Sequence, residues 1–162
     1  MRAGGDSGTG SKPGSRIREL GLVLPETPKP LGAYVEASEV GSLLFLTGML
    51  PVVEGKLPIV GRLGENVSTE EGQKAAHIAA LNALAVAEQH LGDLDRLKKL
   101  VKLTVLIVTT EKFAEHAVVA DGASKLFVQI FGPKLGHTRV TYGVRSMPLC
   151  APVIVETVFE IE

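Results

Sequence analysis

The 162-residue sequence has a single cysteine, no excess of charge of either sign and no long apolar run. With only Cys150 present, an intramolecular disulfide and a cysteine-based metal cluster are excluded. The 17 Lys and Arg residues against 18 Asp and Glu residues give a net charge of -1, which offers phosphates no basic field. No run approaches the ~18–20 apolar residues that span a bilayer, and no apolar secretion signal opens the chain. We therefore expect a cytoplasmic protein that binds neither membrane nor nucleic acid.

The generic catalytic motifs are missing as well. The chain contains no glycine-rich nucleotide loop, no zincin helix motif and no nucleophile elbow. Its histidines, at His77, His90, His116 and His137, are too scattered for the ligand spacing of a zinc site. Cys150 stands in a turn region between two prolines, where an incidental thiol is expected rather than a nucleophile. We expect no metal and no cofactor.

The length and composition predict one domain preceded by a tail. A chain of this size with 45% hydrophobic residues can bury a sizeable core. Residues 1–15 are rich in Gly, Ser and Lys and have almost nothing apolar, which predicts a flexible tail. A transit peptide is the alternative because Arg2 and Lys12 are basic, but Asp6 and the glycines interrupt any amphipathic helix. Residues 16–162 form the predicted domain.

Hydrophobic periodicity predicts two helices among several strands. The first helix begins at a capping box, Ser68 to Glu71, and ends at Gly92. The second begins at Thr110 and ends at Gly132. Strands are predicted at residues 33–37, 42–50, 100–109, 138–144 and 153–161, with 57–60 as an optional short strand. This order predicts an α+β fold, a mixed sheet with both helices on one face.

Arg139 is the most informative polar residue because it opens an otherwise apolar strand. A guanidinium among apolar side chains needs an anion to offset its desolvation. A ligand carboxylate could supply that anion, since the planar fork of arginine binds carboxylates bidentately. Glu156 on a neighbouring strand is the other candidate, and the residues alone leave both open. Glu36, Arg145 and Glu160 are interpreted as solvated strand charges.

Several segments resemble the RidA/YjgF family, also called L-PSP endoribonuclease-like. They are LGAYV at residues 31–35, LFLTGMLP at 44–51, LGDLDRLKKLVKLTVLI at 91–107 and HTRVTYGV at 137–144. The resemblance extends over roughly residues 17–162. The first helix, with AALNALAVAEQHLGDLDR, and the stretch DGAS at residues 121–124 are similar to the YjgF-like subgroup rather than to the best-studied imine deaminases.

The resemblance implies a chorismate-mutase-like fold and a homotrimer with three clefts between subunits. It also implies a deaminase that hydrolyses enamine or imine products of amino-acid enzymes to 2-keto acids and ammonia, without a cofactor. Arg139 matches the family arginine that clamps the substrate carboxylate. Tyr34, Thr47 and Gly48 match other substrate-binding positions, and backbone N–H groups near Thr141 and Gly48 would complete the carboxylate site.

Two departures from the family pattern bear on catalysis. The glutamate that is thought to hold the hydrolytic water in the deaminases aligns with Ile154, while Glu156 lies one pleat further along and is the candidate replacement. Asp121 stands where the family has a neutral asparagine. A non-catalytic, carboxylate-binding or regulatory trimer is therefore the second hypothesis. An endoribonuclease or translation inhibitor is the third, and the near-neutral charge disfavours it.

Overall fold

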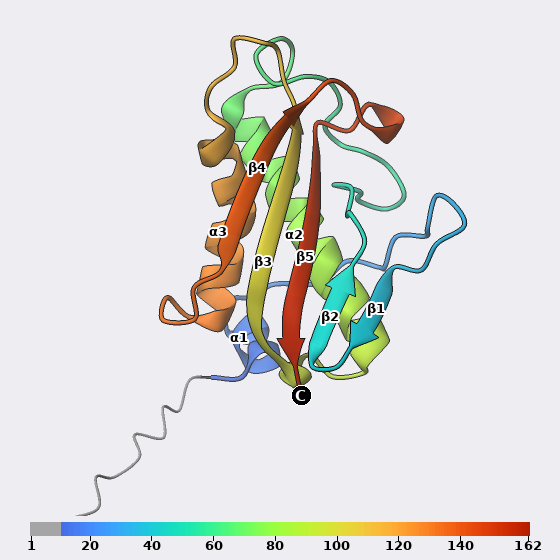
Figure 1. Cartoon of the computed structure of the whole chain (residues 1–162), viewed down its shortest axis with the longest axis vertical. Helices are drawn as coiled ribbons and strands as arrows, with labels where there is room; N and C mark the ends of the chain where they lie inside the picture. The colour runs from blue at the N-terminus through green and yellow to red at the C-terminus, as the bar shows by residue number, and fades with distance from the viewer. Residues whose placement is uncertain (1–10) are drawn as a thin grey trace, which may run out of the picture.

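Five strands form one mixed sheet in the order β1-β2-β5-β3-β4, in a computed structural model that describes residues 11–162 (Figure 1). The β3 and β4 strands run parallel because a helix connects them, whereas every other neighbouring pair is antiparallel. The strands are β1 (Ala37–Val40), β2 (Leu43–Leu46), β3 (Leu97–Val108), β4 (Thr138–Val144) and β5 (Val153–Ile161). The short β1 and the longer β4 are the two edges of this sheet.

Two long helices cover one face of the sheet, as Figure 1 shows from the opposite side. They are α2 (Thr69–Leu91) and α3 (His116–Phe131), and a short helix α1 (Pro13–Glu19) packs beside them at the lower end. Single 3-10 turns lie at Leu94–Arg96 and Pro148–Cys150. The predicted α+β fold, a mixed sheet with two helices on one face, is confirmed.

The start of α2 follows directly from the sequence. The Ser68 hydroxyl accepts a hydrogen bond from the backbone N–H of Glu71, and the Glu71 carboxylate accepts one from the backbone N–H of Ser68. Hydrogen bonding of the Glu71 carboxylate to the Ser68 backbone N–H, and then to the Ser68 side chain, holds the pKa of Glu71 below its usual range. Gly92, at φ 75°, ends the helix in the left-handed conformation that favours glycine. Both predicted ends of this helix are confirmed.

Replacing Ser68 by alanine is expected to lower the free energy of unfolding by about 1 kcal/mol, since the loss of a serine N-cap typically has this effect. Urea unfolding of the wild-type protein and of Ser68→Ala measures the change. Ser146→Ala is the matched control, because Ser146 is exposed and caps no helix. Equal unfolding midpoints for Ser68→Ala and the wild type would contradict the role of the cap.

The two long helices cross at a point of backbone contact. A Cβ atom at Gly122 of α3 would overlap the backbone carbonyl oxygen of Gln73 of α2, so only glycine allows this approach. Many of the buried residues of α2 are alanines, including Ala75, Ala79 and Ala83. Small side chains on both helices therefore bring the helix pair close together over the sheet.

Several predictions of strands and boundaries are wrong. The first strand is Ala37–Val40 rather than 33–37, the second ends at Leu46 rather than 50, and β3 spans Leu97–Val108 rather than 100–109. The hairpin turn, predicted at residues 38–41, lies at Gly41 and Ser42, because Gly41 adopts φ 59° and residues 37–40 pair with β2. Residues 57–60 form no strand, since the Val53 and Lys56 bridge only closes a tight turn. The second helix begins at His116 rather than Thr110, because residues 110–113 form a separate turn against the end of β3.

Of the predicted tail, residues 1–15, the first ten lie outside the described part of the chain. Beyond that point the chain is folded earlier than expected, since α1 begins at Pro13. The backbone N–H of Gly14 donates to the Asp95 carboxylate at 2.9 Å, and Ile17 is buried in the core. The beginning of the folded part therefore precedes the predicted boundary at Arg16.

The second face of the sheet carries no helix within the described chain. Phe45 of β2 and Tyr142 of β4 are 42% and 54% exposed, and Ile154 and Val158 lie between them on the same face. An apolar sheet face of this kind normally packs against another layer. No helix of residues 11–162 is long and apolar enough to cross a membrane.

Candidate functional site

Arg139 lies on the edge strand β4 and points toward the helix layer. It is opposite Leu103 in the sheet register, and Leu103 is buried beneath the helices. One guanidinium nitrogen of Arg139, Nη1, donates to Asp121 Oδ1 at 2.7 Å and to Ser124 Oγ at 3.1 Å. Asp121 and Ser124 are one turn apart on α3, so both face the strand. The helix thus fixes the position of the guanidinium.

Glu156, one of the two anions that the sequence left open for Arg139, is not its partner. Leu103 of β3 pairs with Arg139 of β4 and with Thr157 of β5. Thr157 therefore points to the helix-covered face of the sheet, as Arg139 does. Alternate residues of a strand point to opposite faces, and Glu156 therefore points to the free face, where it is exposed. The anion beside Arg139 is instead the Asp121 carboxylate.

The Asp121 contact leaves half of the guanidinium available. Both bonds of Arg139 are made by Nη1, and neither Nε nor Nη2 has a hydrogen-bond partner among residues 11–162. These two nitrogens form one edge of the planar fork, with the geometry for a bidentate carboxylate. The Arg139 side chain is 25% exposed and Asp121 is 41% exposed, so a small ligand can approach. Such an exposed ion pair contributes little to stability.

His137 completes a hydrogen-bonded chain with Ser124 and Arg139. Its Nε2 lies 3.0 Å from Ser124 Oγ, and burial followed by the charge of Arg139 lowers the pKa of His137. Arg139 always donates to the Ser124 oxygen, because a guanidinium has no acceptor atom. The Ser124 hydroxyl donates to His137 only when Nε2 carries no proton, and protonation of the ring reverses this one bond.

This shift makes stability depend on pH. Because the folded pKa of His137 lies below the ordinary value of about 6.5, the unfolded chain binds more protons between the two values. The contribution of neutral His137 to stability is complete above about pH 6.5 and is lost as the pH falls toward the folded pKa. We expect urea midpoints to fall over this range in the wild type and to fall less in His137→Gln. Parallel pH profiles of the two proteins would contradict this expectation.

The other predicted site residues fall into two separate groups. Thr141 is two residues after Arg139 on β4 and pairs with Val105 of β3, so it points to the same face of the sheet as Arg139. Thr47 and Gly48 follow the end of β2, three strands away in the sheet order. A Cβ atom at Gly48 would lie 2.7 Å from the Ile154 side chain, so this pair packs against position 154. Within a single chain, Arg139 and Thr141 therefore lie apart from Thr47 and Gly48.

Tyr34, the remaining predicted site residue, lies near β1 together with Glu36. Tyr34 is 47% exposed in the loop before β1, and its hydroxyl accepts the backbone N–H of Leu31 at 3.0 Å. The backbone carbonyl of Glu36 accepts from the backbone N–H of Thr47 at 2.9 Å. Partial burial raises the pKa of the Glu36 carboxyl. Glu36 is thus less solvated than the sequence interpretation supposed.

The contacts of Ser124 with Arg139 and with His137 were not predicted. The sequence contained two usable signals for them: Asp121 and Ser124 have the spacing of one helix face, and His137 and Arg139 have the spacing of one strand face. Only the pairing of α3 with β4 could join these two faces. Within the described chain, no three His, Cys, Asp or Glu side chains are placed to hold a metal ion.

A comparison with family models identifies the relatives of this fold. Residues 14–161 match the model described as "YjgF/chorismate_mutase-like, putative endoribonuclease". The chain belongs to the YjgF/RidA family. The resemblance predicted from the sequence is thus confirmed, and with it the chorismate-mutase-like fold.

Individual members of the YjgF/RidA family support the same assignment. Protein TCP17 of Trypanosoma cruzi is 36% identical over 91% of this chain and 92% of its own length. A solved structure from Shewanella oneidensis is 36% identical, with a TM-score of 0.88 over 93% of this chain and all of its own. An Agrobacterium tumefaciens structure of unknown function is 33% identical, with a TM-score of 0.81 over 90% and 89% of the two chains.

Proposed function

We propose that the protein is a 2-iminoacid or enamine deaminase that hydrolyses reactive imines to 2-keto acids and ammonia. The proposal rests on the hydrogen bonding of the Arg139 guanidinium. Its Nη1 donates to Asp121 and Ser124, while Nε and Nη2 have no partner among residues 11–162. A substrate carboxylate on that edge would be fixed in position and direction. Imines hydrolyse readily in water, so positioning supplies most of the required acceleration.

The reaction needs only water. The water oxygen bonds to the imine carbon, the C=N π pair moves to nitrogen, and one water proton passes to that nitrogen to give a carbinolamine. The carbinolamine hydroxyl then transfers its proton to the amine nitrogen, its O–H electron pair forms the C=O bond, and the C–N bond breaks to release ammonia and leave the 2-keto acid. Glu156 is the candidate for holding the water, because it is exposed on the sheet face that also carries Ile154 near Gly48.

The proposal requires a second copy of the chain. Arg139 lies on β4, whereas Gly48 follows β2, and two strands separate β2 from β4 in the sheet. We propose a homotrimer in which Arg139 and Thr141 of one subunit face Tyr34, Thr47 and Gly48 of its neighbour. The uncovered sheet face with Phe45 and Tyr142 supports such an assembly, since it offers apolar area for the contact. Light scattering is expected to give three times the monomer mass, and a monomer would contradict the assembly.

A coupled assay tests the activity. An amino-acid oxidase generates the imine in the presence of semicarbazide, which traps the imine that has not been hydrolysed. The wild-type protein is expected to lower the yield of semicarbazone, and Arg139→Ala is expected not to. Lys125→Ala is the matched control, because Lys125 is an exposed basic residue on the same helix as Asp121. Equal trapping with and without the wild-type protein would refute the deaminase.

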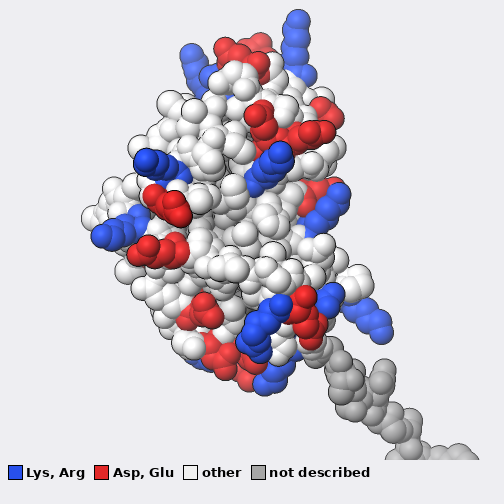
Figure 2. Space-filling model, turned by 180° about the vertical axis from the view of Figure 1, so that it is seen from behind, with Lys and Arg blue, Asp and Glu red and all other residues white. Residues whose placement is uncertain are grey.

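Two alternatives are weighed against this proposal. Ile154, at the position of the family glutamate, favours a non-catalytic protein that binds a small carboxylate, and the assay separates the two. The endoribonuclease alternative is disfavoured, because acidic and basic side chains alternate over the face in Figure 2 rather than forming a basic surface. The lone exposed Cys150 supports our placing of the reaction in the reducing cytoplasm.

A further inference from the structure

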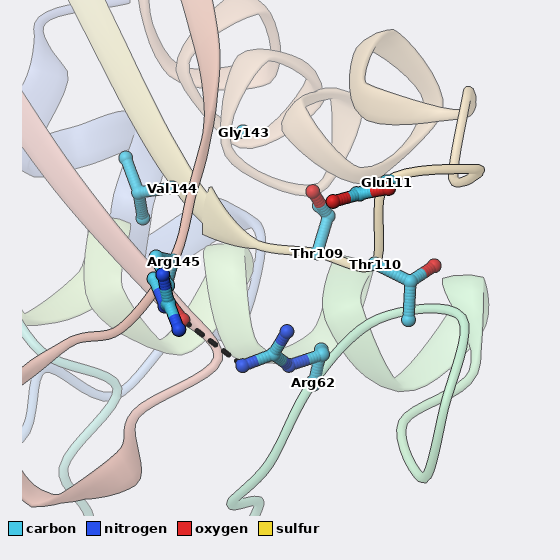
Figure 3. A pocket seen from close by; sticks show the side chains of 7 residues that line it. All are labelled: Arg62, Thr109, Thr110, Glu111, Gly143, Val144 and Arg145. Atoms are coloured by element: carbon cyan, nitrogen blue, oxygen red, sulfur yellow. Dashed lines mark hydrogen bonds between the residues drawn. The ribbon is translucent and has the colours of Figure 1, made fainter.

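A cavity of about 470 Å³ opens where the parallel strands β3 and β4 end (Figure 3). It is lined by Thr109 and Thr110 after β3, by Gly143 and Val144 of β4, and by three charged side chains. The volume lies within the range of small-molecule sites, about 300–1,000 Å³. Gly143 is four residues beyond Arg139, or about 13 Å along an extended strand, so the cavity is separate from the Arg139 site.

Backbone hydrogen bonds hold the walls of this cavity together. The backbone N–H of Leu63 donates to the Val108 carbonyl at 2.8 Å, and that of Thr110 donates to the Leu63 carbonyl at 3.0 Å. The Arg62 guanidinium crosses the cavity and donates to the Arg145 backbone carbonyl at 3.1 Å, the bond drawn in Figure 3. The loop that carries Arg62 is therefore fixed to the ends of both strands.

The floor of the cavity depends on Gly143. A Cβ atom there would lie 2.7 Å from His116 Nε2 and 2.9 Å from Thr109 Oγ1. A larger side chain would displace this imidazole and this hydroxyl. Glycine keeps both polar groups beside the strand and leaves the floor without a side chain.

The charges in the cavity are incompletely paired. Arg145 and Glu111 form no ion pair and no side-chain hydrogen bond within the described chain, whereas Arg62 forms an ion pair with Glu65 at 3.4 Å besides its bond to the Arg145 carbonyl. In Figure 3 the two arginines lie on one side and Glu111 lies beside Thr109 on the other. Arg145 is exposed, as the sequence interpretation supposed, and it also lines this cavity.

We propose that this cavity binds a small zwitterion with a carboxylate and an ammonium group, such as a free amino acid. The carboxylate would lie against Arg145 and Arg62, which offer positive charge and several N–H donors. The ammonium group would lie against Glu111, and the Thr109 and Thr110 hydroxyls offer further hydrogen bonds. A simple anion would leave Glu111 opposing it, whereas a zwitterion uses all three charges.

Binding of L-alanine to the full chain, followed by NMR of the backbone amides, tests the proposal. L-Alanine is expected to shift the signals of residues 109–111 and 143–145. Propionate, which lacks the ammonium group, and ethylamine, which lacks the carboxylate, are expected to bind about tenfold or more weakly. Equal binding of propionate and L-alanine at these amides would overturn the proposal, as would the absence of shifts at millimolar L-alanine.

Matched variants separate this cavity from the Arg139 site. Arg145→Gln and Glu111→Gln are each expected to weaken L-alanine binding about ten- to a hundredfold. Lys112→Gln removes a neighbouring exposed charge that does not line the cavity and is expected to change nothing. Arg139→Lys is expected to leave the shifts at residues 143–145 intact. If Arg139→Lys abolished them while Arg145→Gln did not, the zwitterion would occupy the Arg139 site and the proposal would fail.

Discussion

Replacing Gly122 by alanine is expected to lower the free energy of unfolding by about 3 kcal/mol, the upper end of the usual range for overpacking. The added methyl group would overlap the Gln73 carbonyl, which is backbone and has no rotamer to move away. The two helices would have to separate along a contact of buried alanines. The higher helix propensity of alanine offsets only about 1 kcal/mol of this loss. Urea unfolding with circular dichroism measures the change.

Gly136→Ala is the matched control for Gly122→Ala. A Cβ atom at Gly136 would meet nothing within 4 Å, and its φ lies outside the left-handed region. This variant is expected to unfold within about 0.5 kcal/mol of the wild type, as most surface substitutions do. If Gly122→Ala were as stable as Gly136→Ala, the close approach of α2 and α3 would be contradicted.

Replacing Arg139 by lysine is expected to weaken binding of 2-oxobutyrate by about 1.5–3 kcal/mol, the contribution of a hydrogen bond to a charged group. Lysine keeps the positive charge but loses the planar Nε and Nη2 edge that remains open beside Asp121. Stability is expected to change little, because the Arg139 and Asp121 pair is partly exposed. Isothermal titration calorimetry and urea unfolding of the same variant measure both quantities.

Asp121→Asn is the informative companion to Arg139→Lys. It keeps an oxygen that can accept from Arg139 Nη1 but removes the charge that opposes an incoming carboxylate. Tighter binding of 2-oxobutyrate by Asp121→Asn is therefore expected. Unchanged affinity in a stably folded Arg139→Lys protein would refute the carboxylate clamp.

Much of the fold could be predicted from local sequence signals. The capping box at Ser68, the Gly92 stop and the strand patterns at residues 138–144 and 153–161 agree with the structure residue by residue. The hairpin turn could not be placed, because several polar residues precede Gly41 and only pairing with β2 selects the register. Residues 57–60 do not form the predicted extra strand, because an apolar run forms a strand only where it can pair with a neighbouring strand.

The site was predicted less completely, because its contacts join elements far apart in sequence. Arg139 could be singled out as a cation that needs an anion, yet its neighbour Asp121 lies on a helix, and local patterns do not fix which helix faces which strand. Glu156 could be excluded as the partner of Arg139 only once the pairing of β3 with β4 and with β5 was known, because this pairing places the two side chains on opposite faces of the sheet. Arg145 likewise lines a cavity that its position in the sequence does not indicate.

A crystal structure of the protein with bound 2-oxobutyrate would show whether Arg139 binds the substrate carboxylate between two copies of the chain. We expect the ligand carboxylate on the Nε and Nη2 edge of Arg139, with Thr47 and Gly48 of a second copy of the chain against the keto group. Thr141 would lie beside the ligand on the Arg139 side. A ligand bound away from Arg139, or bound there with no second copy contributing to the site, would refute the proposed intersubunit carboxylate site.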